Sequence, residues 1–337
     1  MKQSLVSSPP DVVRVSSGTA IVLGLAQGKL DAEPTTGYLM TYKLGKCTAN
    51  CGFCPQARGS KSSAEMLSRV TWPTFPTPDV VAALGNGFKK EKIKRVCIQA
   101  LNYPEVFAHL EALVKEIKKE AAVPVSVSCQ PLNRANIELL AEAGVDRLGV
   151  ALDAATEALF DTVKGEGAGG SYSWDSQFRM LAEALEVFGK GNVSTHVIVG
   201  LGETEREAAE IIQRCVDMGV LPALFAFTPV RGTALERNSP PALESYRRVQ
   251  LARFLIVNGL ARADGMRFGG EGKIVSFGLA KEALQEAVKS GAPFRTSGCP
   301  GCNRPFYNEK PSGPIYNYPR KMSREEVEEA AGHVRQA

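Results

Sequence analysis

The sequence predicts an α/β fold built as a (β/α) barrel of the TIM type, partial or full, with six to eight strand–helix units. Apolar runs rich in β-branched residues alternate with amphipathic stretches between about residues 37 and 297. Each strand-like run precedes a helical one, which is typical of parallel strands. The pattern GxGxxG is missing after the first run, and this disfavours an open dinucleotide-binding sheet.

The elements follow in order along the chain. Strand-like runs lie at 36–42, 94–100, 124–129, 145–153, 192–200 and 222–230. The first helix begins with Thr77 as its expected N-cap and Pro78 at the first helical position. Further amphipathic patterns predict helices at 104–121, 133–144, 155–163, 174–188, 203–219 and 242–259.

Three segments are expected. Residues 1–35 form an N-terminal lead-in, residues 36–290 form the barrel, and residues 291–337 form an irregular tail that caps it. The tail is rich in Pro, Gly, Asn and Tyr, and only residues 323–334 resemble a helix.

Composition limits the classes of function. The chain has 337 residues, 44% of them hydrophobic, and a formal net charge of +4, too small to indicate a nucleic-acid partner. No apolar run approaches the ~18 residues of a membrane span, and residues 1–15 lack the apolar core of a signal peptide. We therefore expect a cytoplasmic protein without a nucleic-acid or membrane partner.

Three of the eight cysteines, Cys47, Cys51 and Cys54, lie in a loop directly after the first strand. In a reducing compartment such thiols are ligands or buried residues rather than disulfides. Three thiolates on one loop can hold a [4Fe–4S] cluster and leave one iron free, whereas zinc prefers four ligands in paired units. Phe53 would shield the cluster or pack on an adenine ring. The alternative is three incidental or zinc-binding cysteines.

This loop resembles the signature of the radical S-adenosylmethionine (SAM) superfamily, and the resemblance covers about residues 36–280. It implies that the free iron binds SAM and that one-electron reduction yields a 5′-deoxyadenosyl radical, which abstracts hydrogen from an unactivated carbon. Within the superfamily, Cys54-Pro55-Gln56, IVGLGET (198–204) and PVRGTAL (229–235) are similar to biotin synthase.

The resemblance also implies cofactor contacts. Ile198 and Gly200 would run beside the adenine, and Asp153 would lie near the ribose or else cap the next helix. Glu203 would reach the SAM region or favour the start of the helix that follows it.

Other positions depart from biotin synthase, which holds a second cluster as its sulfur source. Cys97 matches its first ligand, but Ser126 and Ser194 stand at the second and third. Ala151 and Phe225 replace the asparagines that contact dethiobiotin, so a biotin synthase site is not expected.

A second cluster is nevertheless predicted. Cys299-Pro-Gly-Cys302 is a knuckle that directs two thiolates at one metal site, and Cys97 and Cys129 complete four ligands if the tail folds over the barrel. Cys215 is left over as a buried residue. The alternatives are a zinc site, a redox dithiol, or plain core cysteines.

The whole pattern resembles the biotin-synthase-related proteins of archaea, some of which act in pairs as a lipoyl synthase. This implies sulfur insertion from a sacrificial auxiliary [4Fe–4S] cluster into an octanoyl-lysine chain of a lipoyl carrier protein or domain. It also implies a second, paralogous radical SAM protein and an electron donor such as ferredoxin.

The alternatives are a biotin-synthase-like or other radical SAM enzyme with an electron-transfer cluster, and a non-catalytic iron–sulfur or zinc scaffold. His196 is a core residue or touches substrate, and Arg58 and Lys61 are solvated or hold a partner.

Overall fold

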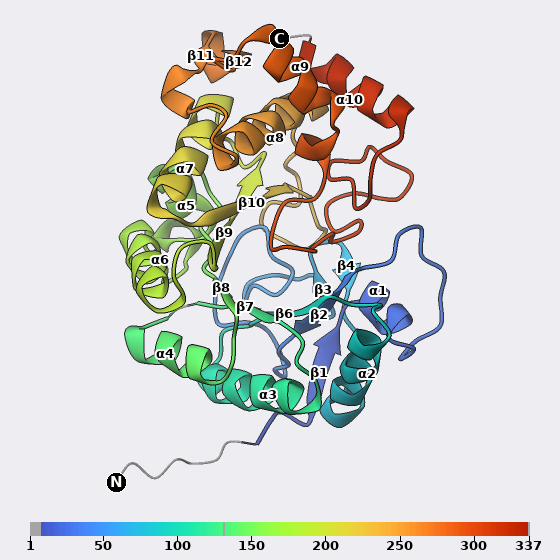
Figure 1. Ribbon diagram of the computed structural model, residues 1–337. Coiled ribbons are helices and arrows are strands. Elements are labelled where there is room, and N and C mark those ends of the chain that lie inside the picture. Colours follow the sequence, from blue (N-terminus) through green and yellow to red (C-terminus); the bar gives the residue numbers. More distant parts are fainter. Residues whose placement is uncertain (1–7, 131, 336–337) are drawn as a thin grey trace.

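The computed structural model describes residues 8–130 and 132–335 (Figure 1). Its main sheet has eight strands in the order β10-β9-β8-β7-β6-β2-β1-β5. These strands are β1 (Val12–Val15), β2 (Thr36–Met40), β5 (Thr74–Pro76), β6 (Arg95–Gln99), β7 (Val125–Ser128), β8 (Arg147–Gly149), β9 (Val193–Val199) and β10 (Leu221–Ala226). Two small antiparallel pairs are separate from it: β3 (Met66–Leu67) with β4 (Val70–Thr71), and β11 (Arg267–Phe268) with β12 (Ile274–Ser276).

The strands expected from the sequence form the parallel part of the sheet. Strands β2, β6, β7, β8, β9 and β10 pair with their neighbours in parallel, as in a partial (β/α) barrel. Strands β1 and β5 extend this sheet in the antiparallel sense. Within the described residues β10 and β5 are its two ends, so the sheet stays open. Strand β1 belongs to the expected lead-in, whose first seven residues lie outside the described part.

Helices cover the outer side of the sheet, except the last two, which lie near the C-terminus and pack against one another (Figure 1). They are α1 (Ser17–Val22), α2 (Thr77–Lys89), α3 (Val106–Glu120), α4 (Arg134–Glu142), α5 (Glu157–Val163), α6 (Trp174–Phe188), α7 (Glu205–Met218), α8 (Leu243–Val257), α9 (Lys281–Lys289) and α10 (Arg324–Arg335). Short 3-10 turns are η1 (Glu166–Ala168), η2 (Ala263–Gly265), η3 (Gly270–Gly272) and η4 (Ala292–Phe294). In the described residues, no helix is both long and apolar enough to cross a membrane.

Successive side chains along a strand point alternately to the buried core and to the inner face of the sheet. In β9, Thr195, Val197 and Val199 are buried, while His196 and Ile198 line an internal cavity. The buried face packs on the helices and excludes water from the apolar surface of both. Side chains on the other face are thereby directed into the space that the sheet curves around.

One helix start differs from the sequence prediction. Pro76, not Thr77, is the N-cap of α2, and Thr77 is its first residue. The Thr77 hydroxyl donates instead to the Pro10 carbonyl, and its N–H donates to Asp11. Thr77 therefore fixes the N-terminal segment against α2, a tertiary role that local sequence does not reveal.

The tail folds across the open side of the sheet, next to β3 and β4 (Figure 1). Ser68 Oγ donates to the Tyr307 carbonyl, and Arg69 donates to the carbonyls of Phe306 and Glu309. Asn303 is tied to the lead-in, because its Oδ1 accepts the Thr35 N–H at 3.0 Å. The turn between β3 and β4 and the end of the lead-in thus hold the tail in place.

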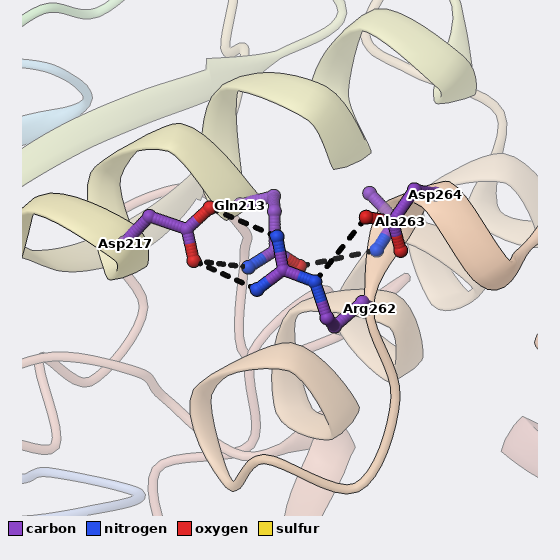
Figure 2. Close-up of polar contacts among 5 residues, drawn as sticks. All are labelled: Gln213, Asp217, Arg262, Ala263 and Asp264. Carbon is purple, nitrogen blue, oxygen red and sulfur yellow. Dashed lines mark hydrogen bonds and ion pairs between the residues drawn. The ribbon is translucent and has the colours of Figure 1, made fainter.

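The turn after α8 is fixed to α7 by an exposed polar network (Figure 2). Arg262 donates from both Nη atoms to the Asp217 carboxylate, at 2.9 and 3.1 Å, and contacts Asp264. Gln213 bridges the Asp217 carboxylate and the Ala263 N–H. The network leaves no free cation or anion among these residues, and we assign it a structural role.

Candidate active site

A cavity of about 200 Å³ lies inside the curve of the sheet. Its lining is mostly apolar and includes Leu67, Val127, Ile198, Ala223, Phe225 and Phe227. The tail forms one wall through Cys299, Cys302, Arg304 and Tyr307, and the cysteine loop contributes Phe53 and Cys54. Both cysteine groups predicted from the sequence therefore reach one chamber.

The three-cysteine loop folds back on itself between β2 and β3. The Cys47 N–H donates to the Gln56 carbonyl at 2.9 Å, and the Cys54 N–H donates to the Cys51 carbonyl at 3.0 Å. The Cys47 thiol accepts the Asn102 N–H at 3.1 Å. All three thiols are free, so the loop presents them without a disulfide.

The thiols are close enough to influence one another. Burial raises the pKa of Cys54 to about 12, the backbone N–H groups of Gln56 and Ala57 oppose this rise, and Cys47 adds to it. The pKa of Cys51 is also raised, chiefly by burial, although the Lys164 ammonium lowers it. Metal binding must therefore displace protons from these thiols, as it does at other thiolate sites.

The donor set fits a three-thiolate iron–sulfur cluster. Backbone N–H groups directed at cysteine sulfurs are the hydrogen bonds that tune such clusters. Within residues 8–130 and 132–335, no three His, Cys, Asp or Glu side chains are gathered closely enough for a single metal ion.

Asp153 lines the cavity, but it does not cap the next helix, since Thr156 is the N-cap of α5. Its backbone has a φ of +67°, and its carboxylate forms an ion pair with Lys164 at 2.6 Å. The Lys164 side chain is fully buried and also donates to the Ala151 carbonyl and to Gln130. Sequence reasoning missed Lys164, because a lysine at a helix end is usually solvated.

The other predicted cofactor residues divide into two groups. Phe53 and Ile198 line the cavity. Gly200 has a φ of +104°, and a Cβ there would lie 2.7 Å from Pro241, so only glycine fits. The Glu203 carboxylate accepts the N–H groups of Gly200 and Leu201, and burial raises its pKa. Glu203 therefore stabilises the turn beside the cavity without lining it.

A second group of thiols comprises Cys97, Cys299 and Cys302. Burial, reinforced by the neighbouring Cys299 and Cys302, raises the pKa of Cys97 to about 12. The Cys302 Sγ lies 3.2 Å from the Tyr38 hydroxyl, and the Cys299 Sγ lies 3.7 Å from the Ser126 hydroxyl. The tail knuckle thus meets β6 and β7 as the sequence predicts.

Cys129 is not brought to this group. It is buried just after β7, it does not line the cavity, and burial alone raises the pKa of its thiol. Ser126, a residue of β7 that lines the cavity, lies beside Cys299 in place of Cys129. Cys215 lies in the core within α7, as expected from its helical pattern.

Two arginines flank the second thiol group. Arg95 is buried, donates to Ser126 Oγ and to the Pro300 carbonyl, and leaves its Nε without a partner. The Arg304 guanidinium lies 3.7 Å from the centre of the Phe225 ring and donates to two carbonyls. Neither forms an ion pair with a carboxylate anywhere in the described chain. Sequence reasoning missed both, since nothing local distinguishes them from surface arginines.

His196 faces the same chamber. Its ring lies 4.8 Å from the Phe225 ring, and its partial exposure is to the cavity. Burial lowers the pKa of His196 to about 4; Asp153 opposes this fall, and Arg304 and Lys164 add to it. The imidazole is therefore neutral near pH 7.

Comparisons with known proteins agree with this geometry. The sequence profile of the Radical SAM superfamily matches residues 42–215, just over half of the chain. The biotin synthase of Bordetella avium (strain 197N) is 25% identical over 279 residues, covering 78% of each protein. The biotin synthase of Allorhizobium ampelinum is 27% identical over 242 residues, covering 68% of each.

Solved structures share the fold. Methylornithine synthase superposes with a TM-score of 0.51 at 14% identity, over 71% of this chain and 77% of that one. The FeFe-hydrogenase maturase from Carboxydothermus hydrogenoformans gives a TM-score of 0.50 at 14% identity, over 67% and 52% of the two chains. At such identities the likeness concerns the fold alone. With the profile match, the cysteine loop and the partial barrel taken together, the chain belongs to the radical SAM superfamily.

Proposed function

We propose that this radical SAM enzyme inserts sulfur into an unactivated C–H bond of an octanoyl-lysine chain, as one component of a lipoyl synthase. One observation carries the proposal: Cys97, Cys299 and Cys302 share a cavity with Cys54 of the first cysteine loop. A substrate held between the two groups would touch both.

Charge supports a second, auxiliary [4Fe–4S] cluster at Cys97, Cys299 and Cys302. A buried cation without a counter-ion is costly, and the buried Arg95 has no carboxylate partner among the described residues; the partly exposed Arg304 has none either. An anionic cluster held by three thiolates would provide that counter-ion. The fourth ligand is then a residue other than cysteine, and the Ser126 and Tyr38 hydroxyls are the nearest to these sulfurs.

The residues of this chain would have distinct tasks. Cys47, Cys51 and Cys54 would hold the first cluster, which supplies, when bound, the electron that cleaves SAM. Phe53 and Ile198 would lie against the cofactor, and Asp153 with Lys164 would present fixed charges beside it. The tail would exclude water, which protects a reactive carbon radical from side reactions.

The lining suits an alkyl chain better than a polar ring. Phe225 and Phe227 narrow the cavity, and their rings offer apolar contact to methylene groups. The carrier would be an octanoylated lipoyl protein or domain in the cytosol. A paralogous radical SAM protein would add the other sulfur, and a donor such as ferredoxin would supply electrons.

A biotin-synthase-like reaction is the second candidate, and the sequence relatives favour it. Against it, Ser126, Ser194 and Phe225 stand in the cavity where the resemblance places two cysteines and an asparagine. Both reactions require SAM cleavage, whereas a non-catalytic scaffold would release no 5′-deoxyadenosine.

The test is anaerobic reconstitution followed by incubation with SAM, a chemical reductant and either an octanoyl-lysine peptide or dethiobiotin. We expect 5′-deoxyadenosine together with a peptide whose mass has risen by sulfur. Sulfur in dethiobiotin alone would support the second candidate, and 5′-deoxyadenosine without any sulfur product would indicate an electron-transfer cluster.

The double variant Cys299→Ala, Cys302→Ala separates the two clusters. We expect about eight irons per chain in the wild type and about four in the variant. The variant should still cleave SAM but should form no C–S bond. Cys215→Ala, a core thiol outside the cavity, is the matched control. Equal iron in all three proteins would contradict the auxiliary cluster.

A further inference from the structure

The first cysteine loop rests on the end of α5 and on the turn that follows it. The Gly52 N–H donates to the Val163 carbonyl at 2.7 Å, and the Asn50 side chain donates to the Ala168 carbonyl at 2.6 Å. These two hydrogen bonds span the loop and fix it against residues 163–168. The residues of this turn are therefore direct neighbours of the thiols.

The residue after Val163 is Lys164, and its ammonium is enclosed by the protein. The side chain is fully buried, and its Nζ lies 2.6 Å from the Asp153 carboxylate. The Nζ also lies 5.2 Å from the centre of the Tyr172 ring and 5.7 Å from that of Phe160. A charge without solvent around it is poorly screened, so its field acts on neighbouring groups more strongly than that of a surface lysine.

Tyr172, whose ring lies beside the ammonium, is itself joined to the cysteine loop. Its hydroxyl accepts a hydrogen bond from the Asn102 side chain. The backbone N–H of Asn102 donates to the Cys47 Sγ at 3.1 Å. The ammonium is thus held beside the loop from two sides, through Val163 and through Tyr172.

The two charges of the ion pair act on the thiols in opposite directions. Burial raises the pKa of Cys51, the Lys164 ammonium opposes this rise, and the Asp153 carboxylate adds a smaller contribution to it. Burial also raises the pKa of Cys54, and Asp153 adds to that rise. The ammonium therefore favours negative charge on this loop, and the carboxylate disfavours it.

We infer that Lys164 raises and Asp153 lowers the reduction potential of the cluster on the first cysteine loop. A [4Fe–4S] cluster on three thiolates is an anion, and reduction adds one more negative charge. A nearby cation stabilises the reduced form more than the oxidised form, and a nearby anion does the reverse. In this step a low-potential one-electron reductant loses one electron and the cluster gains it, and no bond forms or breaks.

The inference deepens the proposed function, because it rests on the cluster that cleaves SAM, but it does not depend on the product. The sign of the shift distinguishes an effect of charge from a structural one. Looser packing would admit water to the cluster in either variant and would move both potentials in one direction. Removal of opposite charges must move them in opposite directions.

The test is a redox titration of the reconstituted full chain with dithionite at pH 7, followed by electron paramagnetic resonance, without SAM or substrate. The reference and every variant carry Cys299→Ala and Cys302→Ala, so that the signal comes from the first cluster alone. We expect Lys164→Met to lower the equilibrium constant of reduction about tenfold, a potential about 59 mV more negative. Asp153→Asn should shift the potential by a similar amount in the positive direction, and the double variant should stay close to the reference.

Two further variants serve as controls. Lys164→Arg keeps the charge and should keep the potential. Lys118→Met breaks another lysine–aspartate pair, with Asp146 at 2.7 Å, at a more exposed position that does not line the cavity, and should also keep it.

The inference is overturned by shifts of one sign in both single variants, by an unchanged potential in Lys164→Met, or by an equal shift in Lys118→Met. If Lys164→Met binds too little iron for a titration, Asp153→Asn decides alone, and a potential that does not rise overturns the inference. The expected shifts in a protein that forms no sulfur product would instead overturn the proposed function alone.

Discussion

At the scale of single residues, the cysteines divide by what surrounds them. Cys97 lines the cavity and senses the charges of Cys299 and Cys302, whereas Cys129 is buried by apolar contacts only. We predict that Cys97→Ala loses about four irons per chain and that Cys129→Ala keeps all of them. Iron and sulfide analysis after reconstitution checks this. If Cys129→Ala also lost four irons, Cys129 would belong to the ligand set.

Lys164 and Asp153 form a buried ion pair at the cavity wall. Removing one partner leaves the other charge buried, which costs about 3 to 5 kcal/mol. We therefore predict that Lys164→Met strongly lowers the midpoint of urea unfolding. The double variant Lys164→Met, Asp153→Asn should lose less than the sum of the single variants, because it leaves no unpaired charge. Additive losses would show that the pair is not coupled.

The sequence predicted those site residues that lie close together along the chain. Cys47, Cys51 and Cys54 lie within eight positions, so their pattern alone indicates a cluster. Lys164 acquires its role through Asp153, 11 residues earlier, and Arg95 and Arg304 through Ser126 and Phe225, which are much farther away in the sequence. No local pattern encodes such contacts.

At the scale of elements, α7 follows the IVGLGET segment and begins with a capping box. Thr204 accepts the Glu207 N–H, and the Glu207 carboxylate accepts the Thr204 N–H at 2.7 Å. We predict that Thr204→Ala destabilises the protein by about 1 kcal/mol, as measured by urea unfolding. Thr204→Ser, which keeps the hydroxyl, should stay close to the wild type. An equal loss in both would point to packing of the methyl group on Gly272 instead.

The parallel strands were predictable, because each lies in a buried, mostly apolar run between turn signals. Strands β1 and β5 were not. Val12–Val15 is a four-residue run within an otherwise irregular lead-in. Thr74–Pro76 ends on a proline and directly follows another, Pro73, and prolines disfavour strands. Both are strands through pairing at the end of the main sheet, β1 with β2 and β5, and β5 with β1.

At the scale of the whole molecule, the tail covers the open side of the sheet. One buried carboxyl in the tail, that of Glu309, makes the stability of this arrangement depend on pH. Burial raises the pKa of Glu309 to about 8, although Arg304, Arg247 and Arg69 oppose the rise. Its Oε2 has no hydrogen-bond partner. The folded protein therefore holds a neutral carboxyl that ionises in the unfolded chain near pH 4.5.

The sign of the effect follows from that difference. Between about pH 4.5 and about pH 8 the folded state binds more protons than the unfolded state, so the contribution of Glu309 to stability falls as the pH rises. We predict that Tm declines from about pH 5 to about pH 8, and that Glu309→Gln flattens this decline. Glu271→Gln, at an exposed residue, should leave the decline intact. A variant as pH-dependent as the wild type would contradict a neutral Glu309.

The two thiol groups also differ in when they can exist. Cys47, Cys51 and Cys54 leave the ribosome almost together, and their loop closes over a short stretch of chain. Cys97 must wait for Cys299 and Cys302, some two hundred residues later, and for the lead-in contact between Thr35 and Asn303. Synthesis therefore imposes an order: the first thiol group is complete while the chain is still growing, and the second is complete only after the last segment has folded.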